Sequence, residues 1–378
     1  MPFSWPTSRA LLARLALTGA ALATTLTAHA QILIGQTSGF SGIAAAGVKE
    51  TTEGARLWLD FVNARGGVNG QKIELISMDD KFEPPLAAAN AKKLITERNV
   101  VALFLNRGTP HTEAIRPLLD EYRIPLIAPS TGAMVLHKPV HPFIFNVRAT
   151  YQREAERAVQ HLATIGMTRV AVVHVDDSFG ADAAAGAAKG FAAAKLQPLF
   201  VTRYDRTKPD FHVIAEQAAQ KEAQAVLFFG TGQTVADGVK AIRDAGSRAQ
   251  IVTLSNNASG GFVKQLGANA TGVIVSQVFP NERTMSVPVV KEATELARAK
   301  GLPGVTPSMM EGYAAAKVLV EALQRAGAKP TRESLTAALN GLSSVDLGGL
   351  KLGYSPTNHT GLNYAELSII GADGRFVR

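Results

Sequence analysis

The sequence predicts an α/β protein made of two doubly wound lobes, each a parallel sheet covered by helices. Strand and helix signals alternate almost without interruption from residue 32 to about residue 280. The predicted strands are runs of Val, Ile and Leu, which is typical of strands buried on both faces of a sheet. The alternation starts again after residues 143–151, so we expect the strands to divide between two sheets.

The first lobe opens with the strand 32–35 and a helix over 50–64, where Ala55, Leu59 and Val62 share one face at helical spacing. The elements that follow are the strand 72–78, a helix that opens at Pro84-Pro85, the strand 100–105, the helix 111–122 and the strand 124–128. The stretch 143–151 then leads to the second lobe.

The second lobe repeats the same order of strands and helices. Its elements are the helix 152–165, strand 169–175, helix 181–194, strand 199–204, helix 211–221, strand 225–230, helix 235–245, strand 251–255 and strand 272–278. Three helices near 288–300, 308–326 and 331–340 lack strands of their own, so we expect them to return to the first lobe. The β-rich tail, "LKLGY" and "YAELSIIG", then completes the second lobe.

This order predicts a discontinuous N-terminal lobe (31–148 plus 281–345) and C-terminal lobe (149–280 plus 346–378). The chain then crosses between the lobes three times. We expect the crossings at "FNVRATY", near "QVFPN" and near "VDLGG" (345–349).

Residues 1–30 have the pattern of a secretory signal peptide. Arg9 and Arg14 lie in the n-region, an apolar stretch runs from Leu15 to Leu26, and Ala28-His29-Ala30 fits the small-residue cleavage rule. A membrane anchor is the alternative, but the apolar stretch is shorter than the roughly 20 residues that span a bilayer. We therefore expect cleavage before Gln31 and an exported, soluble product.

Composition and motifs favour ligand binding over catalysis. The formal net charge is +8, but the charges are scattered, so we expect no nucleic-acid partner. The chain has no cysteine, no G-x-S-x-G elbow and no H-E-x-x-H motif, and its histidines lack metal-ligand spacing. We expect no cofactor, no metal and no enzymatic activity. The pairs Asp79-Asp80 and Asp176-Asp177 are interpreted as turn formers and helix caps.

Six polar loops follow predicted strands at their carboxyl ends, where open parallel sheets bind ligands. They are QTSGFSG (36–42), NRGTPHT (106–112), PSTGA (129–133), DDSFGAD (176–182), GTGQT (230–234) and SNNASGG (255–261). Each leads toward a helix N-terminus, which favours an anion. The Walker A pattern is absent, and residues 35–47 lack the dinucleotide pattern G-x-G-x-x-G, so a carboxylate is the favoured anion.

From Ile32 to Arg378 the chain resembles the periplasmic solute-binding proteins of branched-chain-amino-acid-type ABC transporters. The resemblance rests on motifs in the family's order: "TSGFSG", "GARLWLDFVNARGGVNGQKIEL", "GTP" before a helix, "PSTGA", "FNVRATY", "DDSFG" and "EGYAAAKVLVEAL". It implies a type I periplasmic binding fold, in which two lobes joined by a three-segment hinge close on a small solute. It also implies a periplasmic location and an inner-membrane permease as partner.

The resemblance assigns the ligand carboxylate to Thr109 and to Ser130-Thr131-Gly132, and it places Phe179 in the opposite wall. In the amino-acid binders of the family, an acidic residue of the second lobe holds the ligand ammonium. The matching loop here, SNNASGG, has no acid at 255–257. We therefore predict a carboxylate without an α-amine, such as an aromatic, aliphatic or hydroxy/keto acid.

Five further residues complete the predicted site. Arg107 adds a charge-assisted bond to the carboxylate, Ser41 donates a hydrogen bond from the first loop, and Tyr151 forms an aromatic wall. Asn256 and Gln277 meet a hydroxyl or carbonyl of the ligand.

Three alternatives stay open at this point. A branched-chain amino acid is one, if Glu311 reaches the cleft and replaces the missing acid. A sensor that reports to a membrane receptor is the second, and a secreted α/β hydrolase is a remote third. The favoured prediction is a monomeric component of an ABC importer that binds a small carboxylate and has no segment inserted in the membrane.

Overall fold

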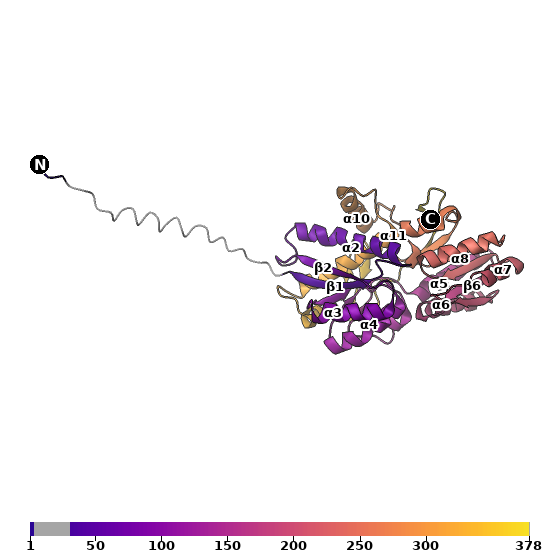
Figure 1. Cartoon of the computed structure of the whole chain (residues 1–378), viewed down its shortest axis with the longest axis horizontal. Coiled ribbons are helices and arrows are strands. Elements are labelled where there is room, and N and C mark those ends of the chain that lie inside the picture. Colours follow the sequence, from indigo (N-terminus) through magenta and orange to yellow (C-terminus); the bar gives the residue numbers. More distant parts are fainter. Residues whose placement is uncertain (4–30, 378) are drawn as a thin grey trace. The chain divides into compact units, whose positions relative to one another are not determined.

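Two sheets with helices on their faces organise the protein, as the alternation of strands and helices predicts (Figure 1). The computed structural model describes residues 1–3 and 31–377. Most of the predicted signal peptide therefore lies outside the described residues. Gln31–Arg378 form one compact unit that contains both sheets.

The first sheet is wholly parallel and has the strand order β2-β1-β3-β4-β5. Its strands are β1 (Ile32–Ser38), β2 (Ile73–Asp79), β3 (Ala102–Phe104), β4 (Leu126–Ile127) and β5 (Ile144–Phe145), and the helices among them are α2 (Ala45–Ala64), α3 (Pro84–Thr96), α4 (Thr109–Tyr122) and the short η1 (Met134–Leu136). Successive strand residues face opposite sides. Phe104 thus packs in the core beside α2, while Leu103 packs in the core beside α3 and α4.

The second sheet has the order β14-β13-β10-β9-β8-β6-β7. Its strands are β6 (Val170–Val175), β7 (Val201–Tyr204), β8 (Ala225–Phe229), β9 (Gln250–Thr253), β10 (Ile274–Gln277), β13 (Glu366–Ile370) and β14 (Phe376–Val377). The helices are α5 (Tyr151–Thr164), α6 (Ser178–Ala194), α7 (His212–Gln220), α8 (Gly232–Asp244), α9 (Gly260–Leu266) and the short η2 (Ser255–Asn257) and η3 (Gly267–Asn269). Only β13 and β14 join it with antiparallel pairing.

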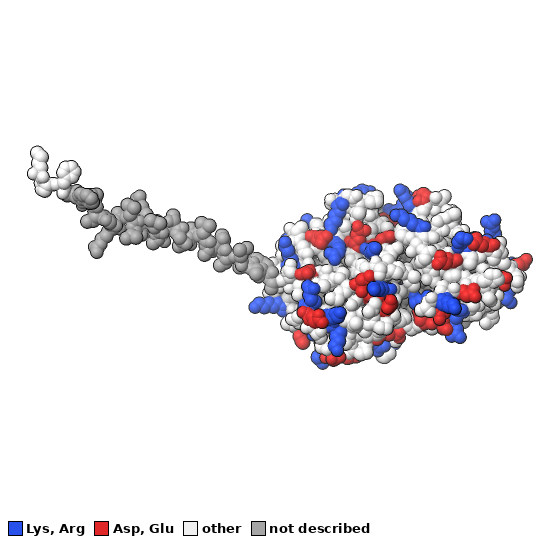
Figure 2. All heavy atoms as spheres, viewed as in Figure 1, with Lys and Arg blue, Asp and Glu red and all other residues white. Residues whose placement is uncertain are grey.

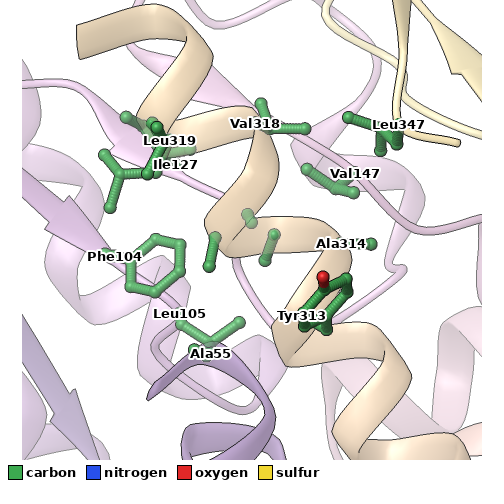
Figure 3. Close-up of a cluster of buried hydrophobic side chains, with 14 of the residues drawn as sticks. Ala55, Phe104, Leu105, Ile127, Val147, Tyr313, Ala314, Val318, Leu319 and Leu347 are labelled. Carbon is green, nitrogen blue, oxygen red and sulfur yellow. The ribbon is translucent and has the colours of Figure 1, made fainter. Parts of the chain in front are cut away.

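Three late helices return to the first lobe. They are α10 (Pro288–Ala299), α11 (Pro307–Arg325) and α12 (Arg332–Asn340), and their apolar side chains share one core with α2, as Figure 3 shows for Tyr313 and Ala55. The axes of α2 and α11 approach closely at Gly312, where a Cβ atom would lie 1.7 Å from the carbonyl oxygen of Thr51. Only glycine fits at this crossing.

The stretch after α12 packs on the first lobe beyond the predicted third crossing. Leu347, Leu350 and Tyr354 are buried in the first lobe's core, and Figure 3 shows Leu347 beside Val147 and Val318. The small ladder of β11 (Val345–Asp346) and β12 (Lys351–Leu352) belongs to this stretch. Apolar residues up to Leu362 thus complete the core around α11, and the chain reaches the second sheet only at β13. We therefore propose residues 346–362 as part of the N-terminal lobe.

Several helices begin earlier than their apolar periodicity predicts. The expected starts were 50, 111, 181 and 235, whereas the observed starts are Ala45, Thr109, Ser178 and Gly232. The first turns consist mostly of small or polar residues, so they carry little apolar signal. As a result, Thr109 and Phe179 lie in first helical turns rather than in loops. The helix α9 was not expected at all.

The surface of the described chain carries both signs of charge. Figure 2 shows Lys and Arg interspersed with Asp and Glu on the visible face. Among the residues that the structure describes, no helix has the length and apolar character needed to cross a membrane.

Candidate ligand-binding site

A narrow pocket with an internal volume of about 10 Å³ lies at the carboxyl ends of the strands, between the two lobes. The loop after β2 supplies Phe82, and the segment after β3 supplies residues 107–110. The second lobe supplies Phe179, Arg206, Thr231 and Asn256, and Tyr151 comes from the end of the first crossing. This volume holds about one water molecule, so the lobes have to separate to admit a ligand.

Arg107 crosses from the first lobe to the second. Its guanidinium donates a hydrogen bond to the backbone carbonyl of Asn256, and it lies against Gly47 of α2. The residue is only 5% exposed, and burial lowers the pKa of its guanidinium. Within the described residues, no carboxylate forms an ion pair with Arg107. This cavity wall therefore carries a buried positive charge with no carboxylate at ion-pair distance, while Glu311 and Glu50 oppose the lowering of its pKa from further away.

Thr109 lines the cavity, and the PSTGA loop supports it from behind. The hydroxyls of Thr109 and Thr131 lie 2.8 Å apart and share a hydrogen bond. The backbone N–H of Ser130 donates to the carbonyl of Asn106, and Gly132 accepts from the N–H of Tyr151. Ser130, Thr131 and Gly132 are buried, but they are not among the lining residues. The structure thus places this loop behind Thr109, and its direct contact with a ligand stays a prediction.

Aromatic side chains form the second wall. Tyr151 and Phe179 are both buried and meet edge to face, with ring centroids 4.8 Å apart. Gly132 holds Tyr151 in place, because a Cβ at this glycine would lie 2.5 Å from the carbonyl oxygen of Ala149. Only glycine allows the loop to press against the crossing segment.

Phe82 is a lining residue that the sequence analysis missed. It has a left-handed backbone (φ 62°), which is unusual for a residue with a side chain, and the carboxylate of Asp80 holds its N–H at 2.9 Å. Burial raises the pKa of Asp80 to about 6, although its hydrogen bonds oppose the shift. Asp79 and Asp80 thus form turns, as predicted. The turn is charged and short, so it did not stand out among the polar loops.

Arg206 was also missed, although it follows the end of strand β7. Its Nε donates to Asp177 at 2.8 Å, and its guanidinium lies over the Phe82 ring of the other lobe, 5.2 Å from the centroid. Asp177 also caps α6 by accepting from the N–H groups of Phe179 and Gly180, as the sequence predicts. The carboxylate of Asp177 therefore neutralises the charge of Arg206. Among the described residues, no carboxylate forms such an ion pair with Arg107.

Asn256 offers the cavity an unused acceptor. Its amide nitrogen donates to the carbonyl of Gly230 at 2.9 Å, while its buried Oδ1 has no hydrogen-bond partner among the described residues. Thr231 lies nearby with its hydroxyl 3.5 Å from Arg206. A hydroxyl-bearing ligand would find its acceptor at Asn256.

Two predicted site residues lie outside the lining of this pocket. Ser41 is exposed, and its hydroxyl donates to Asp79 at 2.6 Å, so it ties the first loop to β2 and does not line the cavity. Gln277 is buried in β10 and does not line the cavity either. The hydroxyl of the preceding Ser276 donates to Glu154, and successive residues of a strand point to opposite faces. Gln277 is thus directed away from Glu154.

A buried ion cluster lies behind the aromatic wall. Arg148, in the first crossing, binds Glu154 of α5 and donates to the hydroxyl of Ser255 at 2.6 Å. Its other terminal nitrogen is 3.8 Å from the carboxylate of Glu311 on α11. Burial alone would lower the pKa of Arg148, but Glu154 raises it above the ordinary value. Glu311 contacts this cluster and is not among the lining residues of the cavity.

The buried ring of His111, beside the cavity, is expected to make the free energy of unfolding depend on pH. The ring is 1% exposed and stacks on Phe82, and burial lowers its pKa to about 4. The folded pKa lies below the unfolded value, so stability is lost as pH falls from about 6.5 toward 4. We expect the wild type to lose about 2 kcal/mol more unfolding free energy than His111→Gln between pH 7 and pH 5. Urea unfolding at both pH values measures this difference.

His137, whose pKa burial also lowers to about 4, is present in both proteins and cancels in the comparison. Parallel pH profiles for the two proteins would contradict the prediction. Within the described residues, no group of three or more His, Cys, Asp or Glu side chains is placed to hold a metal ion.

Known proteins are similar to this chain over nearly all of the compact unit that begins at Gln31. The periplasmic binding protein family matches residues 31–374. The Leu/Ile/Val-binding protein homolog 3 of Brucella melitensis is 24% identical over 338 residues, which cover 87% of this chain and 89% of that protein.

Two solved structures are similar to this chain over almost their whole length. A substrate-binding periplasmic protein from Ralstonia solanacearum is 31% identical, with a TM-score of 0.85 over 92% of this chain and 99% of its own. A possible leucine/isoleucine/valine-binding protein from Rhodopirellula baltica is 25% identical, with a TM-score of 0.84 over 93% of this chain and 97% of its own. These two share the type I periplasmic binding fold seen here.

Proposed function

The chain belongs to the periplasmic binding protein family, and we propose that it is the substrate-binding component of an ABC importer for a small organic carboxylate. The family implies a periplasmic location, which agrees with the predicted signal peptide and cleavage before Gln31. The relatives reported above are named as binding proteins, and a binding role agrees with the lack of catalytic motifs.

The observation that carries this proposal is the buried guanidinium of Arg107. A buried charge is costly unless it is paired, and no described carboxylate pairs with this one. A ligand carboxylate in the cavity would provide the missing anion and accept a second hydrogen bond from Thr109. The polar first turn of α4, which begins at Thr109, adds a favourable dipole.

The charges of the cavity also favour a ligand without an α-amine. The lining residues that the structure describes include two arginines and no acid, so a ligand ammonium would meet no counter-charge. The rings of Phe82, Tyr151 and Phe179 suit an apolar body. We therefore favour an aromatic, aliphatic or hydroxy/keto acid, with Asn256 receiving a ligand hydroxyl.

A branched-chain amino acid is the second candidate, and two observations favour it. The Brucella and Rhodopirellula relatives carry leucine, isoleucine and valine in their names. The carboxylate of Glu311 is buried and its Oε1 has no hydrogen-bond partner among the described residues. Binding of an ammonium there would require Glu311 to leave Arg148 and enter the cavity.

Calorimetry on the chain from Gln31 distinguishes the two candidates. The panel contains benzoate, 4-hydroxybenzoate, butyrate and 2-oxoisovalerate beside leucine, isoleucine and valine. We expect at least one plain acid to bind with micromolar affinity or better and the amino acids to bind far more weakly. A thermal-shift screen can select the concentrations, because a ligand at 100 times its Kd stabilises the fold by about 2.7 kcal/mol. Tight binding of an amino acid, with the acids silent, would overturn the proposal.

A further inference from the structure

The segment 255–261 contacts the cavity at one end and the first lobe at the other. At one end, Asn256 lines the cavity and its carbonyl accepts a hydrogen bond from Arg107. At the other end, the N–H groups of Gly260 and Gly261 donate to the carboxylate of Glu50, at 3.1 and 2.8 Å. Glu50 belongs to α2 in the first lobe, whereas the segment belongs to the second. One carboxylate thus joins the lobes next to the cavity without lining it.

The start of α11 holds the same segment from the first lobe. The hydroxyl of Thr306 donates to Glu50 at 2.8 Å and so fixes the carboxylate. The N–H and the hydroxyl of Ser308 both donate to the carbonyl of Ala258, at 3.0 and 2.9 Å. The segment is therefore bound to two first-lobe helices by hydrogen bonds that hold only while the lobes are together.

The backbone of α2 and the backbone of the segment 255–261 approach so closely at Gly261 that this position has no room for a side chain. A Cβ at Gly261 would lie 2.4 Å from the Cβ of Ala46 on α2, a contact that neither backbone can relieve by rotating a side chain. Gly260, its neighbour, has room, because its nearest contact would be Glu50 Oε1 at 3.5 Å. At Gly232, likewise, a Cβ would lie 2.3 Å from the carbonyl oxygen of Ile43.

We propose that Glu50, together with the Gly261–Ala46 contact, is a latch that holds the lobes closed and sets how long a bound ligand is retained. The inference rests on the proposed function, in which the ligand is enclosed between the lobes. Glu50 is a positioning residue: it touches no part of the cavity, but it fixes the segment that carries Asn256. Loss of the latch would favour the open state and leave the choice of ligand unchanged.

The latch can be tested without knowing the ligand. The chain has no cysteine, so cysteines introduced at the exposed positions Arg56 on α2 and Lys240 on α8 accept one spin label each. Pulsed electron resonance then reports the distance between the lobes in the ligand-free chain from Gln31. We expect Glu50→Gln and Gly261→Ala to shift the distribution to longer distances. Matched controls are Glu53→Gln, an exposed acid of the same helix, and Gly260→Ala, and both should match the parent.

Stopped-flow kinetics with benzoate as the probe provides the second measurement. We expect dissociation to be about 10- to 100-fold faster in Glu50→Gln, the range for a lost hydrogen bond to a charged group, with the order of affinities across the acid panel preserved. Unchanged distances in both variants would overturn the latch. If Gly261→Ala fails to fold, the distances measured in Glu50→Gln alone test the latch. If no acid binds but the distances shift as expected, the latch stands and the proposed ligand class fails.

Discussion

Replacing Arg148 with methionine is expected to lower the free energy of unfolding by about 3–5 kcal/mol, because the change leaves a buried carboxylate without its counter-charge. Glu154 is fully buried and would keep only the N–H of Ser255 and the hydroxyl of Ser276 as partners. Methionine preserves most of the side-chain volume, so the loss reports the charge rather than a cavity. Urea or guanidinium unfolding measures the change as a shift in midpoint.

The double variant Arg148→Met with Glu154→Gln separates the two causes. Removing both charges takes away the unpaired carboxylate, so we expect the double variant to be more stable than Arg148→Met alone. Equal stability of the single and double variants would show that the methionine disrupts packing at the first crossing. In that case the ion pair would not be the source of the loss.

Replacing Arg107 with methionine is expected to weaken carboxylate binding by about 2–5 kcal/mol, which is roughly 30-fold or more in Kd. Among the described residues that line the cavity, this guanidinium is buried with no carboxylate at ion-pair distance, so the variant loses both the charge and the hydrogen bond to Asn256. Titration calorimetry with benzoate and with benzamide measures the effect. The wild type should prefer the acid strongly, and the variant should lose that preference.

Comparison of acid with amide is needed because Arg107 also donates to the carbonyl of Asn256 across the lobes. A variant that only impairs closure would weaken both ligands equally, and that outcome would contradict the assigned role. Ser41→Ala is the matched control, since its hydroxyl is already bound to Asp79 outside the cavity. We expect no change in affinity from that substitution.

The candidate site was predictable where a side chain's role follows from its place after a strand. The loop rule indicated the loops that carry Arg107, Thr109, Phe179 and Asn256, because the carboxyl ends of parallel strands meet at one edge, and the family resemblance singled out Thr109 and Phe179 among them; all four line the pocket. The same rule applied to β2 and β7 would have indicated Phe82 and Arg206. Their loops are charged rather than rich in glycine and serine, so they were interpreted as turns or passed over.

Other residues have partners that are distant in the sequence and that local patterns do not reveal. Ser41 lies in a predicted ligand loop, but Asp79 at the end of β2 takes its hydroxyl. Residues 346–362 resemble a β tail, but their leucines fit the space left around α11. Apolar periodicity records which face of an element is buried, and it does not record which neighbour buries it.

By itself, the sequence determined the alternation of strands and helices apart from α9, the parallel pairing of the strands before the tail, and the edge at which the polar loops gather. These follow from local patterns: continuous apolar strands, helical spacing, and capping residues such as Asp177. Only the tertiary structure decided that Arg107 is buried without an anion, that Arg206 is balanced by Asp177, and that Glu50 bridges the lobes. Each of these depends on a contact between segments far apart in the chain, because charge balance and close packing are properties of the assembled neighbourhood rather than of any one segment.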